Sequence, residues 1–173
     1  MTFFVPAHSL EIRPVEQRDL EAVLEVYRQC EDFLALGPAA TASMEMVLKD
    51  RELSRSENGL FCGVFSAGGE LIGVLDYVPQ GYRGRPRMAF IELFMLAAAF
   101  RDQGIGRAVV EALENEIRKG GPVDTILLGV QVNNPLALQF WQRNGYRIVS
   151  KPKLYPDGTT AVDLQKEFGR GAG

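Results

Sequence analysis

The fold of this chain is decided by the stretch Leu96-Ala97-Ala98-Ala99-Phe100-Arg101-Asp102-Gln103-Gly104-Ile105-Gly106-Arg107. An apolar segment, residues 88–96, leads into it, and an amphipathic helical pattern over residues 105–117 leads out of it. This order predicts a buried strand, a glycine-bearing turn and a helix. Glycines allow a ligand to approach the backbone closely, and a helix start offers free N–H groups to an anion. The stretch therefore predicts a phosphate or pyrophosphate site. The alternative is a tight connection whose glycines serve only packing.

Two common phosphate motifs do not fit this stretch. A nucleoside-triphosphate P-loop needs Lys followed by Ser or Thr, and this pair is missing after Gly106. A dinucleotide fingerprint needs a third glycine, and Val109 stands at that position. Both observations argue against a triphosphate or dinucleotide site.

The composition around the stretch is that of one globular domain, which we expect to cover residues 1–168, with a flexible tail at 169–173. Of the 173 residues, 46% are hydrophobic and 24% are charged, and a net charge of -3 gives no general attraction for nucleic acid. Two cysteines and one histidine exclude a four-ligand Cys/His zinc site, and we expect no metal. Cys30 and Cys62 are expected to be buried and reduced, in a cytoplasmic protein. The longest apolar run, residues 93–100, is too short to span a membrane.

Hydrophobic periodicity predicts four main helices and seven strands, in the order strand, two helices, three strands, helix, strand, helix, two strands. That order is typical of an α/β domain with a mixed sheet. The helices are expected to begin near residues 20, 44, 105 and 135. The strands are expected at residues 10–13, 60–66, 71–78, 88–96, 123–132, 146–150 and 159–165.

The quoted stretch resembles the acetyl-CoA signature of the GNAT superfamily, the general N-acetyltransferases, and the chain is similar to the small bacterial-type members. Arg101-x-x-Gly104-x-Gly106 follows an apolar strand as that signature does, and the signature begins with Arg or Gln. Downstream, residues 134–146 are similar to the family's Asn-x-x-Ala helix that ends in Gly-aromatic. The opening Ile12-Arg13-Pro14, followed by Asp19-Leu20, also resembles the usual first strand and helix. The resemblance covers nearly the whole chain in the family's order.

The resemblance implies a GNAT fold: a mixed sheet of about seven strands with four main helices, in which the fourth and fifth strands splay apart to form an acetyl-CoA cleft. The pantetheine arm is then expected to pair with strand backbone around residues 95–97, and the N–H groups of residues 103–107 to hold the pyrophosphate. Asn134 is expected near the pantetheine, as a plain helix N-cap, or in both roles. The cofactor-binding residues implied in this way are Met95, Leu96, Ala97, Arg101, Gln103, Gly104, Ile105, Gly106, Arg107, Asn134 and Trp141.

Glu92 is the candidate catalytic base, because it is the only charged residue between Met88 and Phe100. Burial on a central strand would raise the pKa of its carboxyl, as a base that deprotonates an amine requires. A related position carries a glutamate in the aminoglycoside-acetylating branch of the superfamily. The alternative is a buried ion pair with an arginine at position 83, 85 or 87. Asp76 is a second carboxylate that would meet a cationic amine or form a salt bridge at a strand end.

Trp141 stands where many GNAT enzymes have a tyrosine that protonates the leaving thiolate, and an indole N–H is no practical proton source. Tyr27, Tyr77 and Tyr155 are candidate replacements, each expected to be structural. The resemblance implies transfer of an acetyl group from acetyl-CoA to a primary amine of a small molecule, by direct attack in a ternary complex. The alternatives are acetylation of a protein N-terminus or lysine, and an acyl-CoA-binding module without turnover. We expect a monomer or homodimer with no nucleic-acid or membrane partner.

Overall fold

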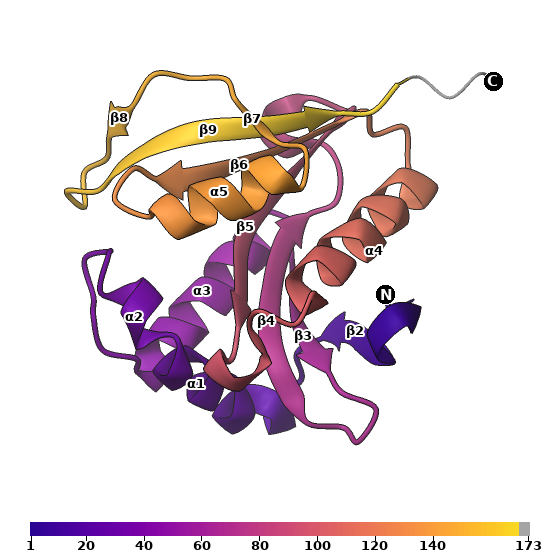
Figure 1. The fold of residues 1–173 in the computed structure, drawn as a ribbon, viewed down its shortest axis with the longest axis vertical. Helices are drawn as coiled ribbons and strands as arrows, with labels where there is room; N and C mark the ends of the chain where they lie inside the picture. The colour runs from indigo at the N-terminus through magenta and orange to yellow at the C-terminus, as the bar shows by residue number, and fades with distance from the viewer. Residues whose placement is uncertain (170–173) are drawn as a thin grey trace.

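A computed structural model describes residues 1–169 of the chain (Figure 1). Within these residues the α-helices are α1 (Leu20–Gln29), α2 (Glu31–Leu34), α3 (Met44–Ser56), α4 (Ile105–Gly120) and α5 (Pro135–Arg143). The strands are β1 (Phe3–Val5), β2 (Leu10–Pro14), β3 (Leu60–Phe65), β4 (Leu71–Val78), β5 (Met88–Leu96), β6 (Thr125–Gln131), β7 (Arg147–Ile148), β8 (Lys153–Leu154) and β9 (Thr160–Glu167).

All of these strands belong to one open, mixed sheet. Its order is β1-β2-β3-β4-β5-β6-β9-β7, and β8 pairs with β9 outside this path. Strands β1 to β5 are antiparallel neighbours, β5 and β6 form a parallel pair, and β9 is antiparallel to its three partners. The predicted α/β class with a mixed sheet is therefore confirmed.

The predicted count of elements was too low by two strands and one helix. The missed elements, β1, β8 and α2, have three, two and four residues, which is too short for a periodic pattern to be recognised. The leading strand β1 is nevertheless clearly amphipathic, because Phe3 and Val5 are buried while Phe4 is exposed. The seven strands and four helices that were predicted occur in the expected order. The predicted tail, apart from Gly169, lies outside the described residues.

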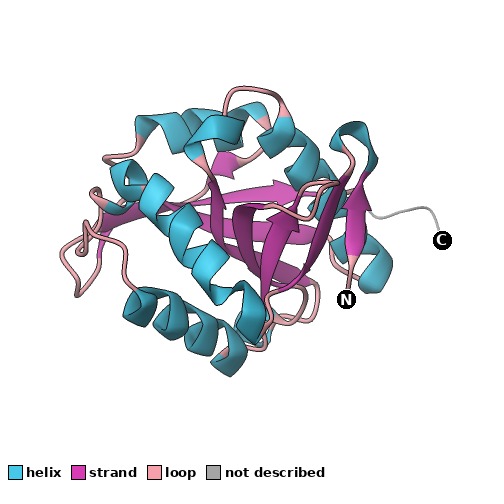
Figure 2. Cartoon of the chain, turned by 90° about the horizontal axis from the view of Figure 1, so that it is seen from below, coloured by secondary structure: helices cyan, strands magenta, loops and turns pink. Residues whose placement is uncertain are grey.

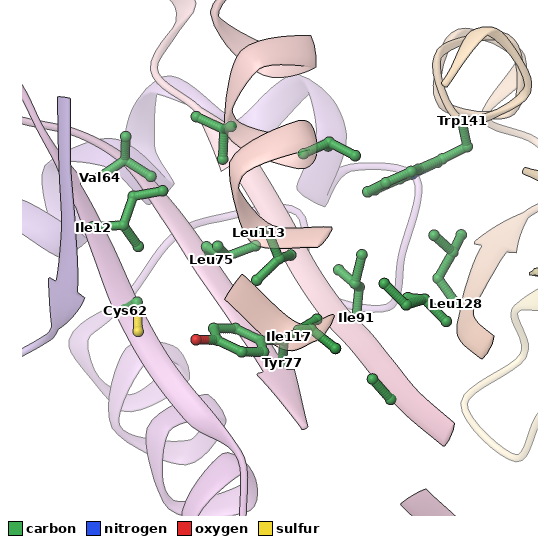
Figure 3. Packing of buried hydrophobic residues seen from close by; sticks show 14 of the residues in the cluster. Ile12, Cys62, Val64, Leu75, Tyr77, Ile91, Leu113, Ile117, Leu128 and Trp141 are labelled. Carbon is green, nitrogen blue, oxygen red and sulfur yellow. The ribbon is translucent and has the colours of Figure 1, made fainter. Parts of the chain in front are cut away.

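Helices cover both faces of the sheet (Figure 2). On one face α4 contributes Val109, Leu113 and Ile117 to a core that also contains Trp141 of α5 (Figure 3). On the other face α1 and α3 cover a second core. Because only the turn of residues 97–104 separates β5 from α4, the end of β5 is connected directly to the N-terminus of α4. This arrangement positions the candidate site.

Cys30 and Cys62 are buried and unpaired, as predicted. Among residues 1–169, no helix is both long and apolar enough to cross a membrane. The same residues contain no group of three or more His, Cys, Asp or Glu side chains arranged to hold a metal ion.

Candidate active site

The central feature of the site is the divergence of β5 and β6. The two strands pair only where residues 88–91 meet residues 125–128, although β5 continues to Leu96 and β6 to Gln131. Beyond Ile91, β5 keeps only its β4 partner, and beyond Leu128, β6 keeps only its β9 partner. The two strands run apart in Figure 1, and we call this divergence the splay. The splay leaves one backbone edge of β5 without a strand partner, as the sequence predicted for the acetyl-CoA cleft.

The pairing between β4 and β5 decides which backbone groups face the splay. The Ala97 N–H donates to the Ile72 carbonyl at 2.8 Å, and Leu96 lies opposite Gly73. Along a strand, the backbone groups of successive residues point alternately toward and away from a given neighbouring strand. Since the Ala97 N–H points toward β4, the N–H and C=O of Leu96, and of Phe94 two residues earlier, point away from β4. These groups therefore form the edge that an extended ligand would pair with.

The sequence prediction of residues 95–97 as the pairing edge is only partly met by this geometry. Leu96 faces the splay, whereas the backbone groups of Met95 and the N–H of Ala97 turn toward β4. Phe94 was not predicted, because the residues whose backbone groups face away from β4 are set by the pairing with β4, which the sequence does not reveal. The Leu96 carbonyl also accepts hydrogen bonds from Arg101 Nε at 3.0 Å and Cys30 Sγ at 3.3 Å.

The turn between β5 and α4 carries a row of free backbone donors. Gly104 is the N-cap of α4 and has a φ of 77°, which lies in the left-handed region that favours glycine. Within residues 1–169, the N–H groups of residues 102–107 donate to no backbone or side-chain acceptor. Adjacent free N–H groups at the start of a 16-residue helix fit the phosphates of CoA. The residues present are therefore compatible with the predicted pyrophosphate site.

Gly104 and Gly106, the two glycines of the signature, are each favoured at their positions for a different structural reason. A side chain on Gly104 would have only His8 Nε2 nearby, at 4.0 Å, so the positive φ explains this glycine. A side chain on Gly106 would meet the Phe140 ring at 3.1 Å, so this glycine permits close packing of α4 against α5. The packing alternative that the sequence left open therefore holds for Gly106.

The other side chains of the predicted turn contact neighbouring parts of the protein and do not converge on a common binding site. Gln103 Nε2 donates to the Ala99 carbonyl at 2.8 Å, and Ile105 is buried in the core. Arg107 is exposed and pairs with Glu111 at 2.8 Å, one helical turn later. The turn would therefore bind an anion chiefly through its backbone.

Arg101 does not face the free N–H row. Its guanidinium forms a bidentate pair with Asp32, at 2.7 and 3.2 Å, on α2. It also donates to the Gln29 carbonyl at 3.4 Å and to Cys30 Sγ at 3.3 Å. The first residue of the signature thus ties the turn to the end of α1 and to α2.

Asn134 and Trp141 sit on α5, across the splay from β5. Asn134 is buried and accepts a hydrogen bond from the Ala137 N–H at 3.0 Å, which makes it the N-cap of α5. Trp141 is 7% exposed and packs edge-on against Phe140 and Tyr146, with ring centroids 5.1 Å apart in each pair. Figure 3 shows the indole directed into the core. The main structural role of Trp141 is therefore packing in the hydrophobic core.

The candidate replacements for the missing tyrosine are not placed for proton transfer at the splay. Tyr27 is fully buried and donates to Asp50 Oδ2 at 2.8 Å. The Tyr77 hydroxyl lies 3.9 Å from the Met1 sulfur. Burial raises the pKa of both phenols well above the ordinary value. Tyr155 is partly exposed on the loop between β8 and β9.

Glu92 lies at a bulge of β5. Asp76 of β4 pairs with Leu93 and Tyr77 pairs with Ile91, so Glu92 is the extra residue between them. Glu92 is exposed, not buried as predicted, because the bulge turns it out of the sheet. Removal of water by the surrounding protein still raises the pKa of its carboxyl, and the charges of nearby carboxylates raise it further.

The predicted ion-pair alternative for Glu92 is not formed. Within the described residues Glu92 has no hydrogen bond or ion pair. Arg87 pairs instead with Asp124 at 2.7 Å, and the Arg83 guanidinium lies 5.1 Å from the centre of the Tyr82 ring. The carboxylate is therefore available to a ligand.

Glu92 opens into a small acidic pocket on the α3 face of the sheet. The pocket has a volume of about 120 Å³ and is lined by Asp50, Leu53, Asp76, Glu92 and Leu93. Asp50 was not identified from the sequence, because only the packing of α3 on the sheet brings it here. The hollow is thus lined by the carboxyl groups of Asp50, Asp76 and Glu92, and we call it the acidic pocket.

Asp76 is the most buried carboxylate of the acidic pocket. It is 3% exposed and accepts a hydrogen bond from Ser54 Oγ at 2.6 Å. Burial raises the pKa of Asp76 to about 7, and the charges of Glu92 and Asp50 contribute to the rise. The salt bridge weighed for Asp76 from the sequence is not present among residues 1–169.

A second pocket lies where the loop after α2 meets the hairpin of β8 and β9. Its volume is about 270 Å³, and its walls are formed by residues 36–38, 132–133 and 157–160. It adjoins the end of β6, on the other side of the splay from the turn before α4.

Comparison with known proteins bears directly on this geometry. A model of the acetyltransferase (GNAT) family matches residues 20–146, which include β5, the turn, α4 and α5. The chain belongs to the GNAT family. The recognition made from the two sequence motifs, and the GNAT fold with its open mixed sheet, are therefore confirmed.

Among curated proteins, a probable N-acetyltransferase, san, of Drosophila melanogaster is 33% identical over 89 residues. The match covers 50% of this GNAT chain and 48% of that protein, so the chain spans about half the length of this relative.

Three solved structures show the same fold. An acetyltransferase from Thermus thermophilus has a TM-score of 0.77 and 23% identity, covering 92% of this chain and 97% of that one. RimL, a ribosomal L7/L12 alpha-N-protein acetyltransferase in complex with coenzyme A, has a TM-score of 0.70 and 16% identity, covering 92% and 94%. A spermidine N-acetyltransferase chimera, SpeG from Vibrio cholerae with hSSAT, has a TM-score of 0.68 and 16% identity, covering 91% and 94%.

Proposed function

We propose that this protein is an acetyl-CoA-dependent N-acetyltransferase that acetylates a primary amine of a small, cationic molecule by direct attack in a ternary complex. One observation carries the proposal: the splay has a row of free backbone N–H groups at its α4 side and the acidic pocket at its α3 side. An anionic cofactor and a cationic acceptor would therefore meet from opposite faces of the sheet. Family membership supports acetyl-CoA as the cofactor.

The backbone of this chain supplies most of the proposed cofactor contacts. The N–H groups of residues 103–107 would hold the pyrophosphate, with the positive end of the α4 dipole behind them. The free backbone groups of Phe94 and the N–H of Leu96 would pair with the amides of the pantetheine arm, as an added strand does, while the Leu96 carbonyl is already bonded to Arg101 and Cys30. Asn134 would contribute its amide NH₂, since its oxygen already caps α5. Trp141 would serve as part of the wall behind the arm.

The acidic pocket would bind the acceptor as an ammonium ion and then remove its proton. The cofactor supplies an activated acyl group, a thioester. Glu92, next to the splay and with a raised pKa, accepts the proton directly or through a water molecule, which frees the nitrogen lone pair. The carbon–nitrogen bond forms at the acyl carbon, and the carbon–sulfur bond breaks. Asp50 and Asp76 attract the cation before the proton is lost.

The leaving thiolate needs no acid from this chain. Free thiols have a pKa of roughly 8.5, so a thiolate is a tolerable leaving group and takes its proton from water. This is consistent with Trp141 at the tyrosine position of the family and with its indole directed into the core.

The test is an acceptor panel measured by release of free CoA thiol. It contains a linear polyamine, an aminoglycoside, a neutral aromatic amine and a peptide with a free N-terminus, each with acetyl-CoA. We expect the cationic small amines to be acetylated fastest, and the preference to weaken in Asp50→Asn, which removes one carboxylate of the acidic pocket. No turnover with any amine, together with tight CoA binding, would instead favour the binding-module alternative.

A protein N-terminus is the second candidate acceptor. The second pocket, of about 270 Å³ beside the hairpin, would receive the first residues of the peptide. RimL, of the same fold, acts on a protein alpha-amine. Faster acetylation of the peptide than of the polyamine in the panel would favour a protein N-terminus as the acceptor.

A further inference from the structure

The open ends of both splayed strands are fastened to one short piece of chain. This piece is residues 29–36, the end of α1, α2 and the residues after it, and we call it the bridge segment. Arg101, just beyond the end of β5, binds the bridge segment at Asp32, Cys30 and the Gln29 carbonyl. Asn133, just beyond the end of β6, donates from Nδ2 to the Leu36 carbonyl at 3.1 Å. In Figure 1, α2 lies on the side of the molecule where the two strands diverge.

At the β5 end, two side chains donate hydrogen bonds to the same backbone carbonyl. Arg101 Nε and Cys30 Sγ both donate to the Leu96 carbonyl, at 3.0 and 3.3 Å. The two terminal nitrogens of Arg101 form the bidentate pair with Asp32. This pair lowers the pKa of Asp32, chiefly through the hydrogen bonds from the guanidinium. A bidentate Arg–carboxylate pair fixes both distance and direction.

A further hydrogen bond ties the bridge segment to the loop that follows it. Glu31 Oε1 accepts a hydrogen bond from the Ala42 N–H at 3.0 Å, which fixes the loop between α2 and α3. Leu36, Gly37 and Pro38 line the second pocket, and so does Asn133. The bridge segment thus connects the turn that would hold the pyrophosphate to the second pocket.

We propose that the bridge segment sets the width of the splay, and that Arg101 is a positioning residue for it rather than a ligand of the cofactor phosphates. The donors of Arg101 are already used by the protein, and they point away from the free N–H row of the turn. Loosening the bridge segment would let the ends of β5 and β6 move relative to each other. The strand edge that pairs with pantetheine and the wall of the second pocket would then be less well ordered. So would Glu92 and Leu93, which lie on β5 and line the acidic pocket. This inference rests on the proposed acetyl-CoA site.

Asp32→Asn separates the two roles of Arg101, because Asp32 is mostly exposed and is itself no part of the cofactor site. If Arg101 acts through the bridge segment, Asp32→Asn should weaken CoA binding by about two- to fivefold, the range of an exposed ion pair. It should also raise the KM of the acceptor with a smaller change in kcat. Asp32→Glu keeps the carboxylate and should restore both values. In an Arg101→Gln background, Asp32→Asn should have no further effect.

Calorimetry of CoA binding and steady-state kinetics measure these effects, with the melting temperature as a check on folding. Glu167→Gln is the matched control, since it breaks an exposed ion pair with Arg147 far from the splay and should change neither value. Asn133→Ala tests the other end of the bridge segment and should raise the acceptor KM.

Two results would overturn the proposal. If Arg101→Gln weakens CoA binding while Asp32→Asn leaves it unchanged or tightens it, Arg101 is a phosphate ligand and the proposal is wrong. Unchanged CoA affinity and acceptor KM in all of these variants would also overturn it. Failure of the wild-type protein to bind CoA would contradict the proposed function itself, which keeps the two failures apart.

Discussion

Replacement of Asp76 by asparagine should change how the stability of this protein depends on pH. Asp76 is 3% exposed, and its carboxyl shares the acidic pocket with Asp50 and Glu92. Asparagine keeps the size of the side chain and an oxygen that can accept the hydrogen bond from Ser54. Asp76→Asn therefore removes a titrating group while leaving the local packing nearly intact.

The sign of the effect follows from the two states of the Asp76 carboxyl. In the unfolded chain it titrates at about 3.9, and in the folded protein at about 7. Well below pH 3.9 it is protonated in both states. As the pH rises from 4 to 7, the unfolded chain releases the proton while the folded protein keeps it, so the free energy of unfolding decreases. The difference of about three pH units corresponds to roughly 4 kcal/mol, as an upper limit.

The assay is urea unfolding of wild type and Asp76→Asn at pH values from 4 to 8. The contribution of Asp76 should be mostly present near pH 4 and lost by pH 8, so the wild-type free energy should decline across this window more steeply than that of the variant. At pH 8, Asp76→Asn should be the more stable protein. Glu70→Gln, at the exposed turn between β3 and β4, serves as control and should follow wild type. Parallel curves for Asp76→Asn and wild type would refute the reasoning.

Three other substitutions test separate parts of the site. Glu92→Gln should lower turnover by about 100- to 10,000-fold and abolish the acid limb of the pH–rate profile. The melting temperature and CoA affinity should stay near wild type; an acid limb that persists would remove Glu92 from the mechanism. Gly104→Ala should weaken CoA binding about tenfold by distorting the free N–H row, whereas Gly81→Ala, at nearly the same φ of 79°, should leave it unchanged. Equal CoA affinities in these two variants would argue against the row. Trp141→Phe should reduce the melting temperature more than kcat, and the reverse order would give the indole a chemical role.

The strand–turn–helix unit at residues 88–117 was predictable because its signals are local. An apolar run, two glycines and a helical stripe each lie within a few residues of one another. The row of free N–H groups follows directly from a helix start behind a glycine turn. The splay was expected only through the family resemblance, because no local pattern states where two strands stop pairing.

The remaining parts of the site depend on contacts between distant residues. The partner of Arg101 is Asp32, 69 positions earlier, and nothing in the signature indicates it. The bulge that exposes Glu92 arises from the register between β4 and β5, and one extra residue is enough to change the face on which a side chain lies. The same register gives Phe94, rather than Met95, to the splay. Asp50 enters the acidic pocket only because α3 packs over β4.

The central claim, transfer of an acetyl group from CoA to an amine at the splay, is tested most directly by following the acetyl group itself. The protein is incubated with acetyl-CoA carrying an isotopic label in the acetyl group and with the best amine of the panel, and the products are identified by mass spectrometry. We predict labelled amide and free CoA in equal amounts, formed rapidly by wild type and at least about 100-fold more slowly by Glu92→Gln. Labelled acetate in place of the amide, or free CoA released at the same rate without any amine, would contradict the account.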